Sequence, residues 1–321
     1  MNLQTKIPLS RQSINFIGYE SKILLLGSCF VENVGAKLEY FKFQSVVNPF
    51  GILFHPKAIE NFIQYTLYNK IYSKDDLIFN NEQWHCFDAH SKLSNASKED
   101  LLNTLNEQTK ITSEYLNKAT HIIVTLGTAW VYRIKETGNV VANCHRVPQK
   151  EFSKALLSVD DIQESLQNTV SLIRNVNPKA SIIFTVSPVR HLKDGFIENT
   201  QSKAHLITAI HGILNSQSSI GNSQLHYFPS YEIMMDELRD YRFYKEDMIH
   251  PNQTAVDYIW EKFISVWLDT RAKKTMDEVD AVQKGMLHKP FNPKSEAHQE
   301  FLQNLSLKKQ QLQKQFTHIS F

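Results

Sequence analysis

The stretch KILLLGSCFVENVGAKLEYF, residues 22–41, joins an apolar run to an amphipathic pattern through Gly27-Ser28-Cys29. Residues 22–27 are rich in Ile and Leu and end in glycine, which is typical of a strand in a parallel sheet covered on both faces. Residues 31–41 then repeat apolar side chains at helical spacing. The pattern therefore predicts a strand followed at once by a helix that begins at or just after Ser28.

The same unit recurs along the chain. Further apolar runs predict buried strands at 121–127, 181–188 and 225–228. Helical patterns follow at 55–68, 98–118, 160–176, 200–217 and 252–268. Strands that alternate with helices predict a doubly wound, mostly parallel sheet, whose ligands bind at the carboxyl ends of the strands. The alternating stretch 130–144, with Thr137-Gly138-Asn139 at its middle, predicts a β-hairpin.

The composition changes near residue 270. Beyond that point the chain becomes polar and rich in lysine and glutamine, as in SLKKQQLQKQF. We therefore expect an α/β domain over residues 1–270. Residues 271–321 should form a helical extension that is packed on this domain or loosely attached to it.

Charge and composition narrow the class of protein. The chain has 35 basic and 33 acidic residues, so it lacks the basic excess of a nucleic-acid-binding protein. No apolar run approaches the length of a membrane-spanning helix, and the first residues contain no apolar signal-peptide core. The three cysteines show no CxxC spacing, which favours reduced thiols. We expect a cytoplasmic protein without nucleic-acid or membrane partners.

Ser28 is the first candidate for chemistry. A serine between a strand and a helix N-terminus can present its hydroxyl at the sheet edge, where its own N–H and the helix dipole favour a developing oxyanion. The simpler interpretation is that Ser28 only caps the helix. Cys29 is a competing nucleophile, but its position one step around the helix predicts that it packs behind the sheet as a small apolar residue.

Asp247 and His250 supply a possible base. They stand three residues apart in YKEDMIHP, just before the last of the predicted sheet-covering helices. A carboxylate at this spacing can hold one imidazole nitrogen and leave the other to take a proton from a serine. Alone, the DxxH pattern is short and common, and the alternative is a polar turn.

Six blocks in order resemble the GSCFA family. They are LGSCFVENVGAKL, NPFGILFHP, TLGTAWVYR, ANCHRVP, TVSPVRHLKDG and YFPSYEIMMDELRDYRFYKEDMIHP. The motif that names the family stands here at residues 27–31, with Val31 in place of its final alanine, and the resemblance covers roughly residues 20–270. This family is grouped with the SGNH/GDSL hydrolases. The resemblance implies a three-layer α/β/α, flavodoxin-like fold, with Ser28 as nucleophile, His250 as general base and Asp247 as its orienter.

The sequence departs from the SGNH pattern around the oxyanion hole. SGNH enzymes use the serine N–H, a glycine N–H and the asparagine of a Gly-x-Asn-Asp block. Gly51 fits the glycine, and Gly127 opens the block, but Ala129 stands where the asparagine belongs. The resemblance therefore leaves Asn48 and Asn143 as candidates for the missing carboxamide. Leu26 and Gly27 precede Ser28 where SGNH enzymes usually have Gly-Asp.

Two other residues are candidates for the substrate pocket. His145 follows the predicted hairpin and either lines the pocket or closes a strand end. Arg190 follows the strand at 181–188, where it can clamp a carboxylate or phosphate, or else pair with Asp194 or Glu198.

Metal-ligand residue types occur at His85-Cys86, His90 and Cys144-His145, but adjacent pairs chelate poorly. We expect no metal and no cofactor.

The sequence thus predicts a serine esterase or acyltransferase whose partner is a small acyl ester. An O-acetylated carbohydrate is the substrate that family analogy implies. The missing block asparagine favours an alternative, a non-catalytic module that binds a ligand in the same cleft. Thiol chemistry at Cys29 is a third hypothesis. The residues do not specify the oligomeric state.

Overall fold

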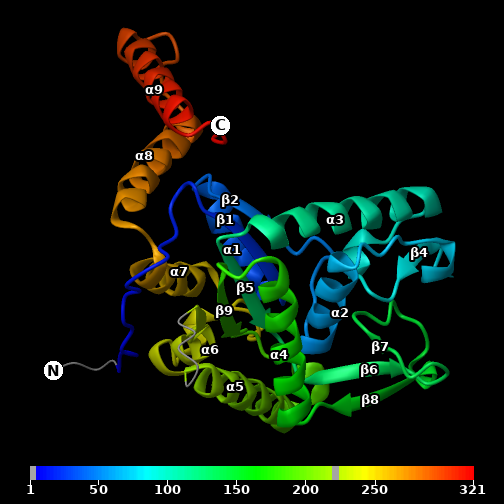
Figure 1. Ribbon diagram of the computed structural model, residues 1–321. Helices are drawn as coiled ribbons and strands as arrows, with labels where there is room; N and C mark the ends of the chain where they lie inside the picture. Colours follow the sequence, from blue (N-terminus) through cyan, green and yellow to red (C-terminus); the bar gives the residue numbers. More distant parts are fainter. Residues whose placement is uncertain (1–4, 219–223) are drawn as a thin grey trace.

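A parallel sheet forms the centre of the molecule (Figure 1). The computed structural model describes residues 5–218 and 224–321. Within these residues, the central sheet has five strands in the order β10-β9-β5-β1-β2, all parallel. The strands are β1 (Lys22–Gly27), β2 (Gln44–Val47), β5 (His121–Leu126), β9 (Ser181–Val186) and β10 (Leu225–Phe228). This is the flavodoxin-like order, and it places the topological switch point between β1 and β5.

Helices cover both faces of the sheet because the strand side chains alternate between them. Leu24 and Leu26 of β1 pack with the helices of one face, and Ile23 and Leu25 pack with those of the other. The first face carries α2 (Pro56–Leu67), α3 (Lys98–Lys118), α4 (Val159–Val176) and α5 (Phe196–Ser218). The second carries α1 (Cys29–Tyr40) and α7 (Gln253–Trp267). The predicted three-layer α/β/α fold is confirmed.

Several shorter elements surround the sheet. The predicted hairpin is confirmed as β6 (Trp130–Ile134) paired with β7 (Val140–Val141), and β8 (Phe152–Leu156) adds a third antiparallel strand. The sequence pattern did not predict β2, β8 or the hairpin of β3 (Leu77–Asn80) and β4 (Gln83–Cys86). These strands are only four or five residues long and are not continuously apolar, so they lack the signal of a buried strand. Short helical turns lie at Lys74–Asp76, Ser91–Leu93, Gln149–Glu151, Leu192–Asp194, Ser230–Glu232 (α6), Ile233–Glu237 and Tyr241–Phe243.

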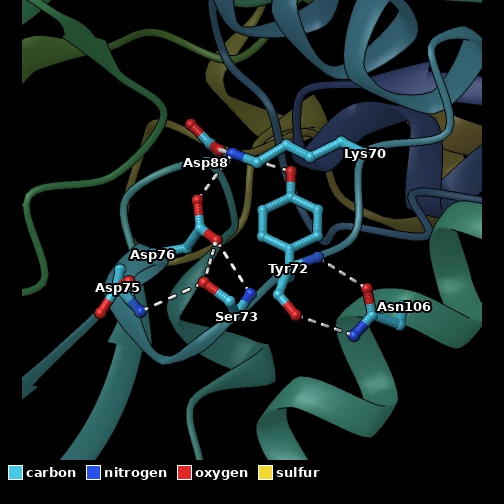
Figure 2. A network of polar contacts seen from close by, with 7 residues as sticks. All are labelled: Lys70, Tyr72, Ser73, Asp75, Asp76, Asp88 and Asn106. Carbon is cyan, nitrogen blue, oxygen red and sulfur yellow. Dashed lines mark hydrogen bonds and ion pairs between the residues drawn. The ribbon is translucent and has the colours of Figure 1, made fainter.

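A polar network fixes the segment between α2 and the β3–β4 hairpin (Figure 2). Lys70 Nζ lies 3.0 Å from both Asp76 Oδ1 and Asp88 Oδ2. The Asn106 side chain of α3 accepts the Tyr72 N–H at 2.8 Å and donates to the Tyr72 carbonyl at 3.1 Å. Because these contacts join residues far apart in sequence, they hold the hairpin segment against α3.

The C-terminal residues form two helices, α8 (Thr270–Leu287) and α9 (Glu296–Gln315). Figure 1 shows this pair projecting from the end of the molecule away from β6 and β8. The Tyr40 hydroxyl of α1 donates to Asp280 Oδ1 at 2.9 Å, and Gln283 Nε2 donates to the Tyr40 carbonyl at 3.0 Å. The pair therefore contacts the α/β part, while a domain boundary at residue 270 stays a prediction. In the described part of the chain, no helix has the length and apolar character needed to cross a membrane.

Candidate active site

Ser28 lies between β1 and α1, at the switch point of the sheet. It occupies the N-cap position of α1, but its side chain makes no capping hydrogen bond. Its hydroxyl is buried and has no hydrogen-bond partner among the described residues. The interpretation of this hydroxyl as a helix cap is therefore wrong. Ser28 is fully buried, and it is Cys29, the next residue, that lines the neighbouring cavity.

Asp247 and His250 are in contact, as their spacing predicts. Asp247 Oδ2 lies 2.7 Å from His250 Nδ1, and Asp247 Oδ1 accepts the N–H groups of Ile249 and His250, each at 2.9 Å. The backbone N–H of His250 is the main cause that lowers the pKa of Asp247 to about 2, followed by the N–H of Ile249 and the imidazole. The turn between them passes through Met248, whose φ of 56° lies in a region that few side chains adopt.

His250 lines a cavity of about 680 Å³ at the carboxyl ends of the strands. Cys29, Trp130, Arg190 and His191 line the same cavity. Because the Ser28 hydroxyl has no partner among the described residues, no hydrogen bond joins it to His250 in this structure. Such bonds are often long before substrate binds, so the arrangement is compatible with a serine–histidine pair.

His191 is a site residue that the sequence analysis did not single out. A methyl group added at Gly127 would lie 3.0 Å from Ser28 Cβ, 3.1 Å from His191 Nε2 and 3.1 Å from Phe54 O. His191 Nε2 is buried and has no hydrogen-bond partner among the described residues. Burial is the main cause that lowers the pKa of His191 to about 3. The only sequence signal for this residue is its place after Arg190, at the end of a strand.

Lys203 is a second residue that the sequence analysis missed. This residue of α5 is only 1% exposed, and its Nζ donates to the carbonyls of Gly127 and Ser187, each at 2.7 Å. Burial lowers its pKa to about 7. No acidic side chain in the described parts of the chain pairs with it. Lys203 therefore ties together the ends of β5 and β9 beneath the site.

The backbone donors expected for an oxyanion hole are already used. The Ser28 N–H donates to the Thr125 carbonyl at 2.9 Å, and the Gly51 N–H donates to the Asn48 carbonyl at 2.7 Å. The expectation that these two N–H groups face an oxyanion is therefore not met in this structure. Of the two predicted carboxamides, Asn48 accepts the Gly27 N–H at Oδ1, at 2.8 Å. Its Nδ2 is buried without a partner in the described chain.

Two further N–H groups near Ser28 are also used. Those of Gly127 and Thr128 both donate to the Phe54 carbonyl, at 2.8 Å and 3.0 Å. Gly127 thus serves the site through the absence of a side chain, which allows Ser28 and His191 to approach its Cα.

Asn143 and His145 close the hairpin rather than form one site together. Asn143 lines the cavity, and its Oδ1 accepts the His145 N–H at 2.9 Å. His145 is buried outside the cavity lining, with Nε2 2.7 Å from the Cys86 carbonyl and Nδ1 3.0 Å from Ser91 Oγ. The prediction of His145 as a pocket residue is wrong, because both ring nitrogens serve the strand end.

Arg190 lines the cavity, and no carboxylate of the described residues forms an ion pair with it. It donates to the Tyr244 hydroxyl at 3.1 Å and lies over that ring at 5.0 Å. Asp194 pairs with Lys154 instead, at 2.5 Å. No ion pair joins Arg190 to Asp194 or Glu198, both of which lie in the described region, so the ion-pair alternative is wrong. Arg190 is left available for an anionic group.

Cys29 packs partly against the apolar cluster on the face of α1 and α7, as expected from the sequence, but it also reaches the cavity. It is half-buried and lines the cavity, because the first turn of α1 faces the site. Burial raises the pKa of its thiol, which disfavours the reactive thiolate. No group of three His, Cys, Asp or Glu side chains within residues 5–218 and 224–321 could hold a metal ion.

Fold and site together define a doubly wound α/β protein with a serine at the end of its first strand and an Asp–His pair before α7. The model of the GSCFA family matches residues 22–263, and that of the GSCFA domain protein, C-terminal domain, matches residues 279–321. The chain belongs to the GSCFA family. No curated protein matches it.

Two solved structures are similar to the chain. One is an acetyl xylan esterase (Est2A) from the rumen bacterium Butyrivibrio proteoclasticus, with 12% sequence identity, a TM-score of 0.40 and coverage of 84% of this chain and 65% of that chain. The other is a family two carbohydrate esterase from Clostridium thermocellum in complex with cellohexaose, with 11% identity, a TM-score of 0.38 and coverage of 77% and 63%. In both cases the match spans less than two thirds of the other chain.

Proposed function

We propose that this protein is a serine hydrolase, an esterase or acyltransferase, that acts on a small acyl ester. One observation carries the proposal. The partnerless hydroxyl of Ser28 lies at the switch point of the sheet, and an imidazole held by a carboxylate, that of His250, lines the adjacent cavity. A nucleophile, a base and an orienter are the three groups that acyl transfer through a serine requires.

The reaction follows the chemistry of these three residues. Ser28 Oγ attacks the acyl carbonyl carbon while its proton passes to His250 Nε2, and Asp247 stabilises the imidazolium that forms. The bond to the leaving alcohol then breaks, and His250 returns the proton to that alcohol. Water, or a second alcohol in a transferase, attacks the acyl-serine by the reverse proton path.

The cavity suits a substrate with a flat or ring-shaped body. Trp130 and Tyr132 line it, and such side chains combine an apolar face with a polar tip. These aromatic walls support an O-acetylated carbohydrate as the substrate class, which otherwise rests on family analogy. Arg190 supplies a cation for a substrate that carries an anionic group.

A non-catalytic ligand-binding module is the second candidate. The observation that favours it is the absence, among the described residues, of any hydrogen bond between Ser28 and His250. In that case the same cavity would bind its ligand without forming a covalent bond.

We also propose that the protein works in the cytoplasm. Cys29, Cys86 and Cys144 are all free thiols, as is usual in a reducing compartment.

Labelling with a fluorophosphonate probe tests the proposed function. Wild type and Cys29→Ala should both be labelled, while Ser28→Ala should not. Absence of labelling in wild type would favour the binding module, and loss of ester turnover in Cys29→Ala alone would favour thiol chemistry. A panel of p-nitrophenyl esters, followed by acetylated sugars, then identifies the acyl group and the alcohol.

A further inference from the structure

Three buried polar atoms without a partner in the described chain belong to residues around the end of β1. They are Ser28 Oγ, Asn48 Nδ2 and His191 Nε2. Asn48 is bonded to Gly27, next to Ser28, and His191 faces Ser28 across Gly127. Buried polar groups are almost always hydrogen-bonded, so unpaired ones in a native site call for an explanation. A substrate atom that receives their hydrogens would provide one.

The backbone N–H groups expected for an oxyanion hole do not meet this need in the structure. The N–H groups of Ser28, Gly51 and Gly127 all donate to carbonyls of the fold. The block alanine, Ala129, has no polar side chain, and its N–H donates to Ser202 Oγ at 2.7 Å. The N–H groups of Cys29 and Phe30, in the first turn of α1, donate to no carbonyl among the described residues, and a side chain can supply a further donor to an oxyanion beside Ser28.

The imidazole of His191 is oriented for this purpose. Its backbone N–H donates to Asn199 Oδ1 at 2.9 Å, and its ring packs edge-to-face on Phe54, with the centroids 5.3 Å apart. Together these contacts fix the residue at the backbone and at the ring. The ring therefore presents Nε2 to Gly127 and Ser28 without being pulled away by another acceptor.

The charge state of His191 also suits a donor. Burial, followed by the positive charges of Lys203 and His250, lowers its pKa to about 3. The ring is therefore neutral at physiological pH and carries one proton. A neutral histidine with the proton on Nε2 can donate a hydrogen bond to a developing oxyanion without a net charge in the buried site.

We propose that His191 is a catalytic residue that donates its Nε2 hydrogen to the oxyanion formed when Ser28 attacks the acyl carbonyl. It takes the place of the asparagine that Ala129 replaces. The carbonyl π electrons move to oxygen as the Ser28 Oγ–C bond forms, and the Ser28 proton goes to His250. His191 keeps its own proton throughout and only shares it with the oxyanion. The inference rests on the proposed function.

His250 has the carboxylate partner that a general base requires, and the surroundings of His191 are different. Asp247 holds Nδ1 of His250, which stabilises the protonated ring. Burial, followed by repulsion from Lys203 and His250 in their charged forms, lowers the pKa of His191 and opposes protonation of its ring. The two histidines thus divide the work, with His250 moving the proton and His191 stabilising the negative charge.

Substitution of His191 by an amide side chain and by an apolar side chain distinguishes a hydrogen-bond donor from a proton-accepting base. His191→Leu should lower kcat on p-nitrophenyl acetate, and the rate of fluorophosphonate labelling, about 100- to 1,000-fold with little change in KM. His191→Gln should recover at least tenfold of that loss, because a carboxamide donates a hydrogen bond. His250→Gln should show no such recovery, because an amide does not take up the serine proton.

His90→Leu is a matched control. His90 also packs against the Phe54 ring, at 6.2 Å, but it does not line the cavity. Its activity should stay within a few-fold of wild type. Thermal unfolding of each variant establishes that it is folded. If His191→Leu does not fold, the kinetic test compares His191→Gln with wild type. The expected result is that His191→Gln retains at least a hundredth of wild-type kcat.

An NMR measurement needs no variant. The ring N–H of His191, assigned in the ¹H–¹⁵N spectrum, should shift downfield when the probe phosphonylates Ser28, because the phosphoryl oxygen then accepts its hydrogen.

The outcomes separate the two proposals. If the probe labels wild type and labels His191→Leu at the same rate, the role of His191 is overturned but the proposed function is not. Equal loss in His191→Gln and His191→Leu would do the same. Failure of wild type to be labelled, or labelling of Ser28→Ala, would overturn the proposed function and this inference with it.

Discussion

Asp247 binds His250 through both oxygens of one carboxylate. Oδ2 lies 2.7 Å from the ring at Nδ1, and Oδ1 accepts the backbone N–H of the same residue at 2.9 Å. The backbone contact fixes the carboxylate, and the ring contact fixes the tautomer and the orientation of the imidazole. The proton of Nδ1 therefore points at Asp247, and Nε2 is left to face the cavity.

Replacement of Asp247 by asparagine tests this orientation. Asp247→Asn keeps the shape of the side chain but favours the wrong tautomer, so kcat should fall about 1,000- to 10,000-fold with KM little changed. Steady-state kinetics on p-nitrophenyl acetate measure the effect. Asp240→Asn is the control, since Asp240 caps a nearby turn and pairs with Arg242. A loss of less than tenfold in Asp247→Asn would exclude the orienter role.

Asn48 should act as an oxyanion donor beside His191. Asn48→Asp keeps an oxygen for the Gly27 N–H but removes the free Nδ2 hydrogens. We expect kcat to fall about 100-fold or more, again with little change in KM. Asn95→Asp is a matched change, because Asn95 Oδ1 also accepts a backbone N–H, that of Ser97 at 2.8 Å. Equal activity of the two variants would contradict a role for the Asn48 amide.

Gly127 should tolerate no side chain. In Gly127→Ala the new methyl group would be 3.0 Å from Ser28 Cβ and 3.1 Å from both His191 Nε2 and Phe54 O. These contacts are tighter than normal packing, so we expect the labelling rate to fall at least tenfold. Gly18→Ala is the control, because nothing lies within 4 Å of its added methyl group. A Gly127→Ala protein labelled at the wild-type rate would show that Ser28 and His191 need not approach each other there.

Lys203 should make stability depend on pH. Its pKa in the folded protein is about 7, against 10.5 for the unperturbed group, so between these values the unfolded chain binds more protons. Stability from this group therefore rises with pH in that window, by at most about 1.4 kcal/mol per pH unit. Below pH 7 both states are protonated and this slope disappears.

Comparison with Lys203→Met isolates this effect. The free energy of unfolding of wild type minus that of the variant should increase between pH 7 and pH 10, because other titrating groups cancel in the difference. Urea unfolding at several pH values measures it. A difference that is constant with pH would show that Lys203 is buried without a change in its proton affinity.

The sequence predicted the layers of the fold well. Four central strands and six helices were expected close to their observed bounds, because continuous apolar runs and helical spacing report burial directly. The one strand of the described central sheet that was missed, β2, is half-buried at the edge of the sheet and has no long apolar run. Strand order also did not follow from the pattern, because pairing depends on contacts between distant segments.

The residues of the candidate site likewise include some that local sequence patterns predicted and some that they did not. Ser28 follows a strand, and Asp247 and His250 are three residues apart, so local patterns sufficed to propose them. His145 was misassigned because its sequence position did not reveal that Cys86 and Ser91 bind its ring. Lys203 was invisible because a lysine within a helical pattern is normally solvent-exposed.

The sequence by itself determined the alternation of strand and helix, the serine at the first strand end and the contact between Asp247 and His250. These features depend on neighbours within a few residues. Only the tertiary structure decided which donors remain free beside Ser28. The distant Thr125 carbonyl occupies the Ser28 N–H, and the Asn48 carbonyl of the same turn occupies the Gly51 N–H. Asn48 Nδ2 and His191 Nε2 have no partner among the described residues. Which polar groups stay unpaired in a buried site depends on every segment that folds around it.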